Sequence, residues 1–225
     1  MINCHPSSLG ENKMNKEQIY KLCSPYTITS KERVFALCDL VENIVKDNIA
    51  GDFIECGTYK GGSVIAMMLA LNELKEYRNI HVYDTFEGMT PPTQYDVTYQ
   101  NEHAANIMNM PIIKCDCSLQ TVIDNINRTV SYPSNMIFFH KGDVCKTLPI
   151  SQHDKIALLR LDTDFYDSTK AELEWLYPKV TENGYTLIDD YGHWNGCRKA
   201  VDEYFKDTIF NKIDYTGIFI KKATV

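Results

Sequence analysis

Four aspartates follow two apolar segments of the sequence and could bind a metal ion together. Asp162 and Asp164 follow one segment, and Asp189 and Asp190 close the next. If both segments are neighbouring strands of a parallel sheet, their carboxyl ends bring the four carboxylates into one cleft. Buried like charges repel one another, and a divalent cation removes that cost. Because oxygen ligands without a Cys/His cluster favour Mg²⁺ or Mn²⁺ over zinc, the pattern predicts a magnesium site.

Each pair of aspartates also has a plainer interpretation when taken alone. A single Asp-x-Asp is commonly a solvated loop or a helix cap, and we expect Asp167 and Ser168 to cap the helix that follows. Two pairs at two apolar strand ends favour the metal. His193 and Trp194 follow the second pair directly. We predict that both contact the substrate, although a histidine beside a site is more often a hydrogen-bonding bystander and a tryptophan can simply pack.

A glycine-bearing turn follows the first predicted strand. It includes Gly57, Tyr59, Gly62 and Ser63, and its glycines let the backbone turn tightly beside a ligand. The spacing differs from the G-x-G-x-x-G of dinucleotide sites. S-adenosylmethionine, a nucleoside without a pyrophosphate, does not need that pattern. Amides at the start of the following helix suit its carboxylate, and Glu55 at the strand end can face its cationic groups.

Two further strand ends carry an aspartate. Asp84, with Thr85 beside it, ends the second strand, and Asp143 follows Gly142 after the third. Asp84 is placed to bind ribose hydroxyls, and Asp143 to reach the adenine amino group. The plainer interpretations are a turn built for packing and aspartates that cap helices. Three such features at successive strand ends favour a nucleoside site.

A parallel sheet is needed to position all of these residues. The apolar periodicity predicts helices at 31–49, 62–77, 118–129, 168–181 and 196–206. It predicts strands at 53–56, 80–84, 136–140, 155–161, 184–189, 209–213 and 217–221. Alternating strands and helices imply an α/β fold with helices on both faces of a mostly parallel, Rossmann-like sheet of seven strands. The last two strands should form an antiparallel hairpin, and 85–110 reads as a long functional loop.

Composition limits the remaining choices. The 225 residues are expected to form one domain, 31–225, preceded by an N-terminal extension, 1–30, that caps the domain or contacts an oligomer partner. A net charge of −7 without any Lys/Arg-rich run excludes a general nucleic-acid backbone binder. No signal peptide or membrane-span pattern is visible. The eight cysteines lack C-x-x-C spacing, so we expect reduced thiols in a cytoplasmic protein.

Four segments of the chain resemble the TylF/MycF family of macrocin-type O-methyltransferases, which belong to the class I S-adenosylmethionine-dependent methyltransferases. The resemblance runs from about residue 30 to the C-terminus. The segments that carry it are GDFIECGTYKGGS (51–63), VYDTFEGMTPPTQYDV (82–97), LLRLDTDFYDST (158–169) and LIDDYGHWNGCRKAVDEYF (187–205).

The resemblance implies S-adenosylmethionine and Mg²⁺ as cofactors and a sugar hydroxyl, on a small molecule or a glycan, as the methyl acceptor. It implies a homo-oligomer, a dimer or larger, and a lid over substrate at about 87–110. By residue, it matches Asp162, Asp189 and Asp190 to the metal ligands and Asp164, beside Asp162, to the catalytic base. It matches cofactor positions to Glu55, Gly57, Tyr59, Ser63 and Asp84.

Two other functional classes remain open at this stage. A metal-dependent hydrolase or hydroxylase-like enzyme would use the same carboxylates, but it leaves the glycine turn and Asp84 unexplained. Iron oxygenases usually need two histidines and a carboxylate, and no such set is visible. A non-catalytic cofactor-binding protein on the same fold is the third possibility, and the presence of both candidate sites, for the nucleoside and for the metal, argues against it.

Overall fold

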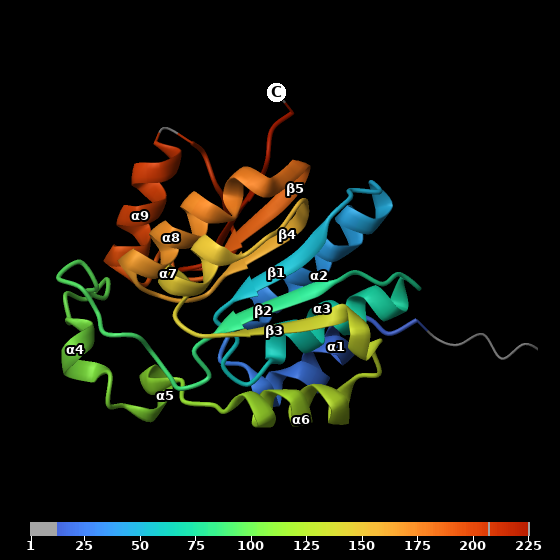
Figure 1. The fold of residues 1–225 in the computed structure, drawn as a ribbon, viewed down its shortest axis with the longest axis horizontal. Coiled ribbons are helices and arrows are strands. Elements are labelled where there is room, and N and C mark those ends of the chain that lie inside the picture. Colours follow the sequence, from blue (N-terminus) through green and yellow to red (C-terminus); the bar gives the residue numbers. More distant parts are fainter. Residues whose placement is uncertain (1–12, 207, 225) are drawn as a thin grey trace, which may run out of the picture.

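The computed structural model describes residues 13–206 and 208–224. Figure 1 shows a twisted sheet between two layers of helices. The strands are β1 (Asp52–Cys56), β2 (Ile80–Asp84), β3 (Ile137–Lys141), β4 (Ile156–Leu161), β5 (Val180–Ile188), β6 (Asn211–Lys212) and β7 (Ile218–Lys221). The longer helices are α1 (Lys16–Cys23), α2 (Lys31–Lys46), α3 (Gly62–Glu73), α6 (Leu119–Thr129), α8 (Tyr166–Trp175) and α9 (Asn195–Phe205). Single-turn helices are α4 (Ala104–Ile107), α5 (Pro111–Lys114) and α7 (Val144–Thr147).

The seven strands lie in the order β3-β2-β1-β4-β5-β7-β6. The first five are parallel, and β7 runs antiparallel between β5 and β6. The prediction of a mostly parallel sheet with a terminal hairpin is therefore confirmed. In the register of β4 and β5, Leu161 lies opposite Ile188, so the aspartates after both strands emerge side by side.

Two apolar cores hold the sheet between its helix layers. One core joins α1, α2, α3 and α6 to the sheet face that carries Phe53, Val82 and Leu158. The other joins α8 and α9 to the face that carries Ile54, Leu159 and Ile188. The alternation of these residues along β1 and β4 follows from the two-residue period of a strand. β1 and β4 are therefore buried on both faces.

Several predicted boundaries are wrong. The helix predicted at 168–181 ends at Trp175, because Pro178 cannot donate a backbone hydrogen bond and β5 already begins at Val180. The predicted loop 85–110 contains the short helix α4, capped by the His103 side chain. The helix predicted at 62–77 ends at Glu73, and the strand predicted at 209–213 is only two residues long.

The N-terminal segment contributes to both the core and the site region. The part of the predicted extension before residue 13 lies outside the described residues. In the described part, Ile19 and Cys23 of α1 are buried against α3 and α2, and Thr27 and Thr29 reach the cavity described below. Within the described ranges, no helix is long and apolar enough to cross a membrane.

Candidate functional site

A cavity of about 280 Å³ opens at the carboxyl ends of the parallel strands. The segment with α4 and α5 lies at this end of the sheet (Figure 1) and contributes Met89, Thr90 and Ile113 to the wall. Most of the predicted site residues line the cavity: Gly57, Tyr59, Ser63, Asp84, Thr85, Gly142, Asp162, Asp164, Asp189, Asp190, His193 and Trp194. Three predicted cofactor residues lie outside its wall, namely Glu55, Gly62 and Asp143.

The turn after β1 is tightly fitted to the turn after β4. A Cβ atom added to Gly57 would lie 2.0 Å from the carbonyl oxygen of Asp162, and the Gly57 φ of +79° is in the left-handed region. Only glycine meets both demands without strain. Tyr59, with a φ of 51°, and Asp164, with a φ of 68°, also have left-handed backbones. Such conformations recur at functional sites, where the surrounding structure maintains them.

Asp84 holds the glycine turn in place. Its Oδ2 atom accepts hydrogen bonds from the backbone N–H of Thr58 at 2.7 Å and of Tyr59 at 3.3 Å. Its Oδ1 atom accepts one from the N–H of Phe86 at 2.7 Å. The carboxylate thus joins the turns after β1 and β2 at the cavity wall, and a lone pair of Oδ1 is left for a ligand hydroxyl.

Two of the predicted cofactor residues have structural partners. Asp143 caps α7 by accepting a hydrogen bond from the N–H of Cys145 at 3.0 Å, which is the plainer interpretation of this aspartate. Glu55 is fully buried below the turn. One of its oxygens accepts a hydrogen bond from Thr58 Oγ1 at 2.8 Å, and the other pairs with Arg160 at 2.7 Å. Glu55 therefore acts on the cavity through Thr58 and Arg160.

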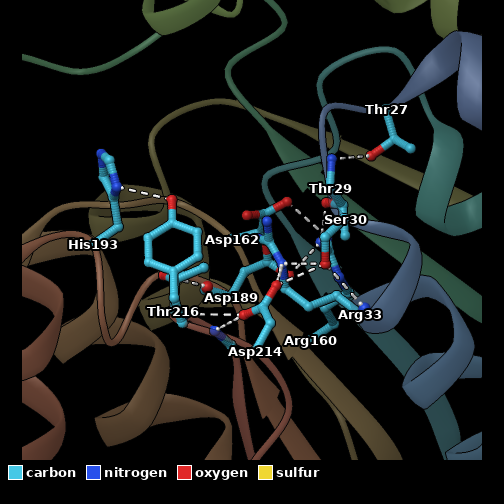
Figure 2. Close-up of polar contacts among 12 residues, drawn as sticks. Thr27, Thr29, Ser30, Arg33, Arg160, Asp162, Asp189, His193, Asp214 and Thr216 are labelled. Carbon is cyan, nitrogen blue, oxygen red and sulfur yellow. Dashed lines mark hydrogen bonds and ion pairs between the residues drawn. The ribbon is translucent and has the colours of Figure 1, made fainter.

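Arg160, in the middle of β4, is surrounded by acidic partners. Its guanidinium is 2.7 Å from Glu55, 2.8 Å from Asp162 and 2.8 Å from Asp189, and it also donates to Thr29 Oγ1 at 3.0 Å. The residue is 1% exposed. Figure 2 shows it between the two strand ends. A buried arginine needs such partners, since an unpaired charge away from water is costly.

A second arginine completes this ionic network. Arg33 on α2 pairs with Oδ2 of Asp189 and, at 3.0 Å, with Asp214 (Figure 2). Ser30, the N-cap of α2, donates a hydrogen bond at 2.7 Å to Oδ2 of Asp214, the same atom that pairs with Arg33. Both oxygens of Asp189 are therefore engaged by arginines from two elements. This network connects α2, β4, β5 and the segment before β7.

A cluster of carboxylates with fewer positively charged partners lies beside this ionic network. Asp162, Asp164 and Asp190 each offer an oxygen within 4.8 Å of the others. In the described part of the chain, neither Asp164 nor Asp190 makes an ion pair with Lys or Arg, and Oδ2 of Asp190 is buried without a hydrogen-bond partner. Burial, together with the nearby charges of Asp162 and Asp189, raises the pKa of Asp164 to about 7, although a hydrogen bond with Asp190 opposes the rise. Burial likewise raises the pKa of Asp190. The residues fit a hard divalent cation, which would relieve this repulsion.

Aromatic side chains gather on the His193 side of the cavity, where His193, Trp194 and Tyr215 line it and Tyr99 packs beside them. The His193 ring lies 5.5 Å from Tyr99 and 6.1 Å from Tyr215 between centroids, and its Nδ1 atom is 3.1 Å from the Tyr215 hydroxyl. Tyr99 and Tyr215 are 54% and 59% exposed. Trp194, in contrast, is 2% exposed and packs edge-on against Phe165. Exposed aromatic rings at a cavity mouth provide a surface for an acceptor, whereas Trp194 mainly packs.

Sequence reasoning missed Arg33, Arg160, Glu172, Tyr99 and Tyr215. Arg160 had a recognisable signal, because it is the charged residue within the apolar strand Ile156–Leu161. Glu172 on α8 is fully buried below the site, where it accepts a hydrogen bond from Thr163 at 2.8 Å. The other three residues come from segments that only the tertiary structure brings to the cavity.

Comparison with known proteins agrees with this geometry. The model of the family described as macrocin-O-methyltransferase (TylF) matches residues 11–222. The chain belongs to the TylF family. Its members compared here are O-methyltransferases, and the chain is accordingly an O-methyltransferase.

Curated relatives of this TylF-family chain show about the same level of identity. Demethyldecarbamoylnovobiocin O-methyltransferase of Streptomyces niveus is 31% identical over 181 residues, which is 80% of this chain and 67% of the relative. Mycinamicin III 3''-O-methyltransferase of Micromonospora griseorubida is 30% identical over 207 residues, covering 88% and 79%. A rhamnosyl-tetracenomycin-C 4'-O-methyltransferase of Streptomyces olivaceus is 32% identical over 204 residues, covering 86% and 74%.

Solved structures support the fold of this TylF-family chain. The O-methyltransferase NovP superposes with a TM-score of 0.76 at 28% identity, over 88% of this chain and 83% of that one. The calicheamicin methyltransferase CalS11 gives a TM-score of 0.68 at 16% identity, over 92% and 90%. At that identity the second match shows the fold alone.

Proposed function

We propose that this O-methyltransferase transfers the methyl group of S-adenosylmethionine to a sugar hydroxyl of a small molecule or glycan, assisted by Mg²⁺ or Mn²⁺. The observation that carries the proposal is the joint presence of two features in one cavity. One is the glycine turn fixed by Asp84, and the other is the under-compensated carboxylate cluster around Asp190. A relative named for a rhamnosyl-bearing acceptor supports the sugar.

The donor is assigned to the side of the cavity formed by β1 and β2. Gly57, Tyr59 and Ser63 line that side together with Asp84, Thr85 and Gly142. Backbone amides at the start of α3 suit the methionine carboxylate, and the remaining lone pair of Asp84 Oδ1 suits a ribose hydroxyl. Glu55 supports this side from below through Thr58.

The cation is assigned to Asp162, Asp189 and Asp190. Asp162 and Asp190 already belong to the close cluster. Asp189 lines the cavity and is held by Arg160 and Arg33, yet each of its carboxylate oxygens has a second lone pair for a metal. When bound, the cation would lower the pKa of an acceptor hydroxyl and orient it. Asp164 is the third carboxylate of the observed cluster. The Asp164→Asn and Asp189→Asn variants in the Discussion distinguish which of these two residues binds the cation.

Asp164 is assigned as the general base. It belongs to the cluster, lines the cavity and, within the described residues, has no arginine or lysine partner. In the transfer, the acceptor oxygen forms a bond to the methyl carbon as the carbon–sulfur bond breaks, and the hydroxyl proton passes to the Asp164 carboxylate. The exposed rings of Tyr99 and Tyr215, with His193, hold the acceptor at the mouth.

A transfer assay tests this function. S-adenosylmethionine labelled in its methyl group is incubated with a panel of rhamnosyl and other glycosides, with Mg²⁺ or with EDTA. We expect transfer to a sugar oxygen that falls at least about 100-fold in EDTA and recovers with Mn²⁺. Transfer that is unchanged in EDTA would contradict the metal assignment, and transfer only to nitrogen or to a sugar-free acceptor would contradict the acceptor class.

A further inference from the structure

A second group of metal-binding side chains lies apart from the cavity. Asp52 begins β1, His81 is the second residue of β2, and His153 precedes β4. None of the three lines the cavity. Each offers one ligand atom, and these atoms all lie within 4.8 Å of one another. No part of the proposed methyl transfer uses them.

The strand register explains why these side chains meet. Ile80 and Val82 point into the core beneath α2 and α3, so His81 and Tyr83 point to the opposite face. In Figure 1 the β2–β3 part of the sheet faces the viewer with no helix in front of it. The chain between β3 and β4 carries His153 back to this face, where the His81 and His153 rings are 4.6 Å apart and nearly perpendicular.

Each of the three side chains is oriented by an outer hydrogen bond. Nδ1 of His81 is 3.0 Å from Nε2 of His140, and Nε2 of His153 is 2.6 Å from the Tyr83 hydroxyl. Asn79 donates to Oδ1 of Asp52 at 3.1 Å. Metal-binding histidines and carboxylates ordinarily use one atom in this way and bind the ion with the other. The atoms left over are Nε2 of His81, Nδ1 of His153 and Oδ2 of Asp52.

One of these leftover atoms has no partner. His153 is 8% exposed, and its buried Nδ1 atom has no hydrogen-bond partner among the described residues. An unsatisfied buried polar atom is unfavourable, and a bound ion would give this nitrogen a partner. Nε2 of His81 and Oδ2 of Asp52 are 3.4 Å apart, a separation that two ligands of one metal ion can have.

We propose that Asp52, His81 and His153 bind a zinc-class dication, with water at the fourth position. Two imidazoles and one carboxylate are a common donor set for zinc, and the nitrogen ligands disfavour Mg²⁺. The ion joins the start of β1, the middle of β2 and the segment before β4. The bound ion therefore stabilises the β1–β2 part of the sheet. It is distinct from the cation proposed for methyl transfer.

Metal titration of the purified, metal-stripped protein tests this site. With Mg²⁺ in excess to occupy the carboxylate cluster, Zn²⁺ is titrated calorimetrically into the wild type and into His81→Gln, His153→Gln, His103→Gln and Asp190→Asn. We expect one zinc equivalent to bind the wild type, and binding at least about 10-fold weaker in the first two variants. His103, which caps α4, is the matched histidine control, and Asp190→Asn removes the other cluster; both should bind zinc as the wild type does. Thermal melting without metal checks that the variants fold.

Two results would overturn the proposal. The first is unchanged zinc binding in both His81→Gln and His153→Gln, and the second is loss of that binding in Asp190→Asn. Nitrogen-15 NMR of the histidine rings in the wild type needs no variant. There, zinc should shift Nε2 of His81 and Nδ1 of His153 and leave the His103 ring unchanged. If zinc leaves both of those nitrogen resonances in place, the assignment is wrong whatever the variants do.

Discussion

Arg160 donates a hydrogen bond to Oδ1 of Asp189 at 2.8 Å, and the two side chains are only 1% and 2% exposed. The same guanidinium reaches Glu55 and Asp162. One buried cation on β4 therefore fixes an acidic residue from each of three strand ends. This arrangement fixes the wall of the proposed methyl-donor subsite relative to the wall of the proposed cation subsite.

Arg160→Met should unfold the protein more easily. The substitution leaves buried carboxylates without a partner, which costs about 3–5 kcal/mol when one member of a buried pair is removed. Urea unfolding measures the change in free energy. Arg198→Met is the matched control, because Arg198 is 58% exposed and contacts Asp202 on its own helix and the Tyr191 ring, so it should change stability by less than about 1 kcal/mol. Equal, small losses in both variants would show that the network does not stabilise the fold.

Gly57→Ala should abolish cofactor binding. Its Cβ would lie 2.0 Å from the backbone oxygen of Asp162, and neither backbone can move without disturbing β1 or β4. Gly61→Ala is the comparison, since Gly61 also has a positive φ but its nearest neighbour is a Val122 side-chain atom at 3.2 Å. Calorimetry with S-adenosylhomocysteine should show no binding for Gly57→Ala and partial binding for Gly61→Ala. If Gly57→Ala binds as well as the wild type, the glycine turn is not the donor site.

Glu172→Gln should make the protein more stable at high pH. Burial raises the pKa of Glu172 above its ordinary value, so the folded protein keeps the carboxyl protonated while the unfolded chain ionises. The contribution of Glu172 to the free energy of unfolding is fully present below the pKa that the carboxyl has in the unfolded chain. It is lost as pH rises through the pKa that the carboxyl has in the folded protein, by at most about 1.4 kcal/mol per pH unit. Glutamine does not titrate and can still accept the Thr163 hydrogen bond.

The melting temperatures of wild type and Glu172→Gln should therefore match near pH 4 and separate towards pH 8, with the variant higher. Glu174→Gln on the same helix is the control, because Glu174 is 54% exposed. A constant difference between wild type and Glu172→Gln across this range would mean that the carboxyl is ionised in the folded protein.

The sheet could be predicted because strand ends and apolar runs are local features. Leu161 and Ile188 each precede an aspartate pair, and β4 and β5 did prove to be neighbours. Apolar periodicity alone predicts the end of α8 too late, because apolar residues continue past Trp175. In the structure Pro178 follows in a separate short turn.

The partners of the site aspartates could not be predicted in the same way. Nothing local to Asp189 indicates that Arg33, 156 residues earlier in the chain, would pair with it. By spacing alone the four aspartates are all uncompensated, whereas in the structure two arginines pair with Asp162 and Asp189 and none pairs with Asp164 or Asp190 among the described residues. Charge balance in a buried site depends on tertiary contacts, which spacing does not encode.

Magnesium titration of the protein saturated with S-adenosylhomocysteine tests the central claim most directly. We expect one Mg²⁺ to bind the wild type and Asp143→Asn, whose carboxylate caps α7. Affinity should fall more than about 10-fold in Asp190→Asn and in Asp189→Asn, because loss of an outer partner alone costs that much. Asp164→Asn should keep the metal and lose turnover; loss of the metal there would make Asp164 a ligand. Equal Mg²⁺ binding by wild type and Asp190→Asn, or none by either, would contradict the account.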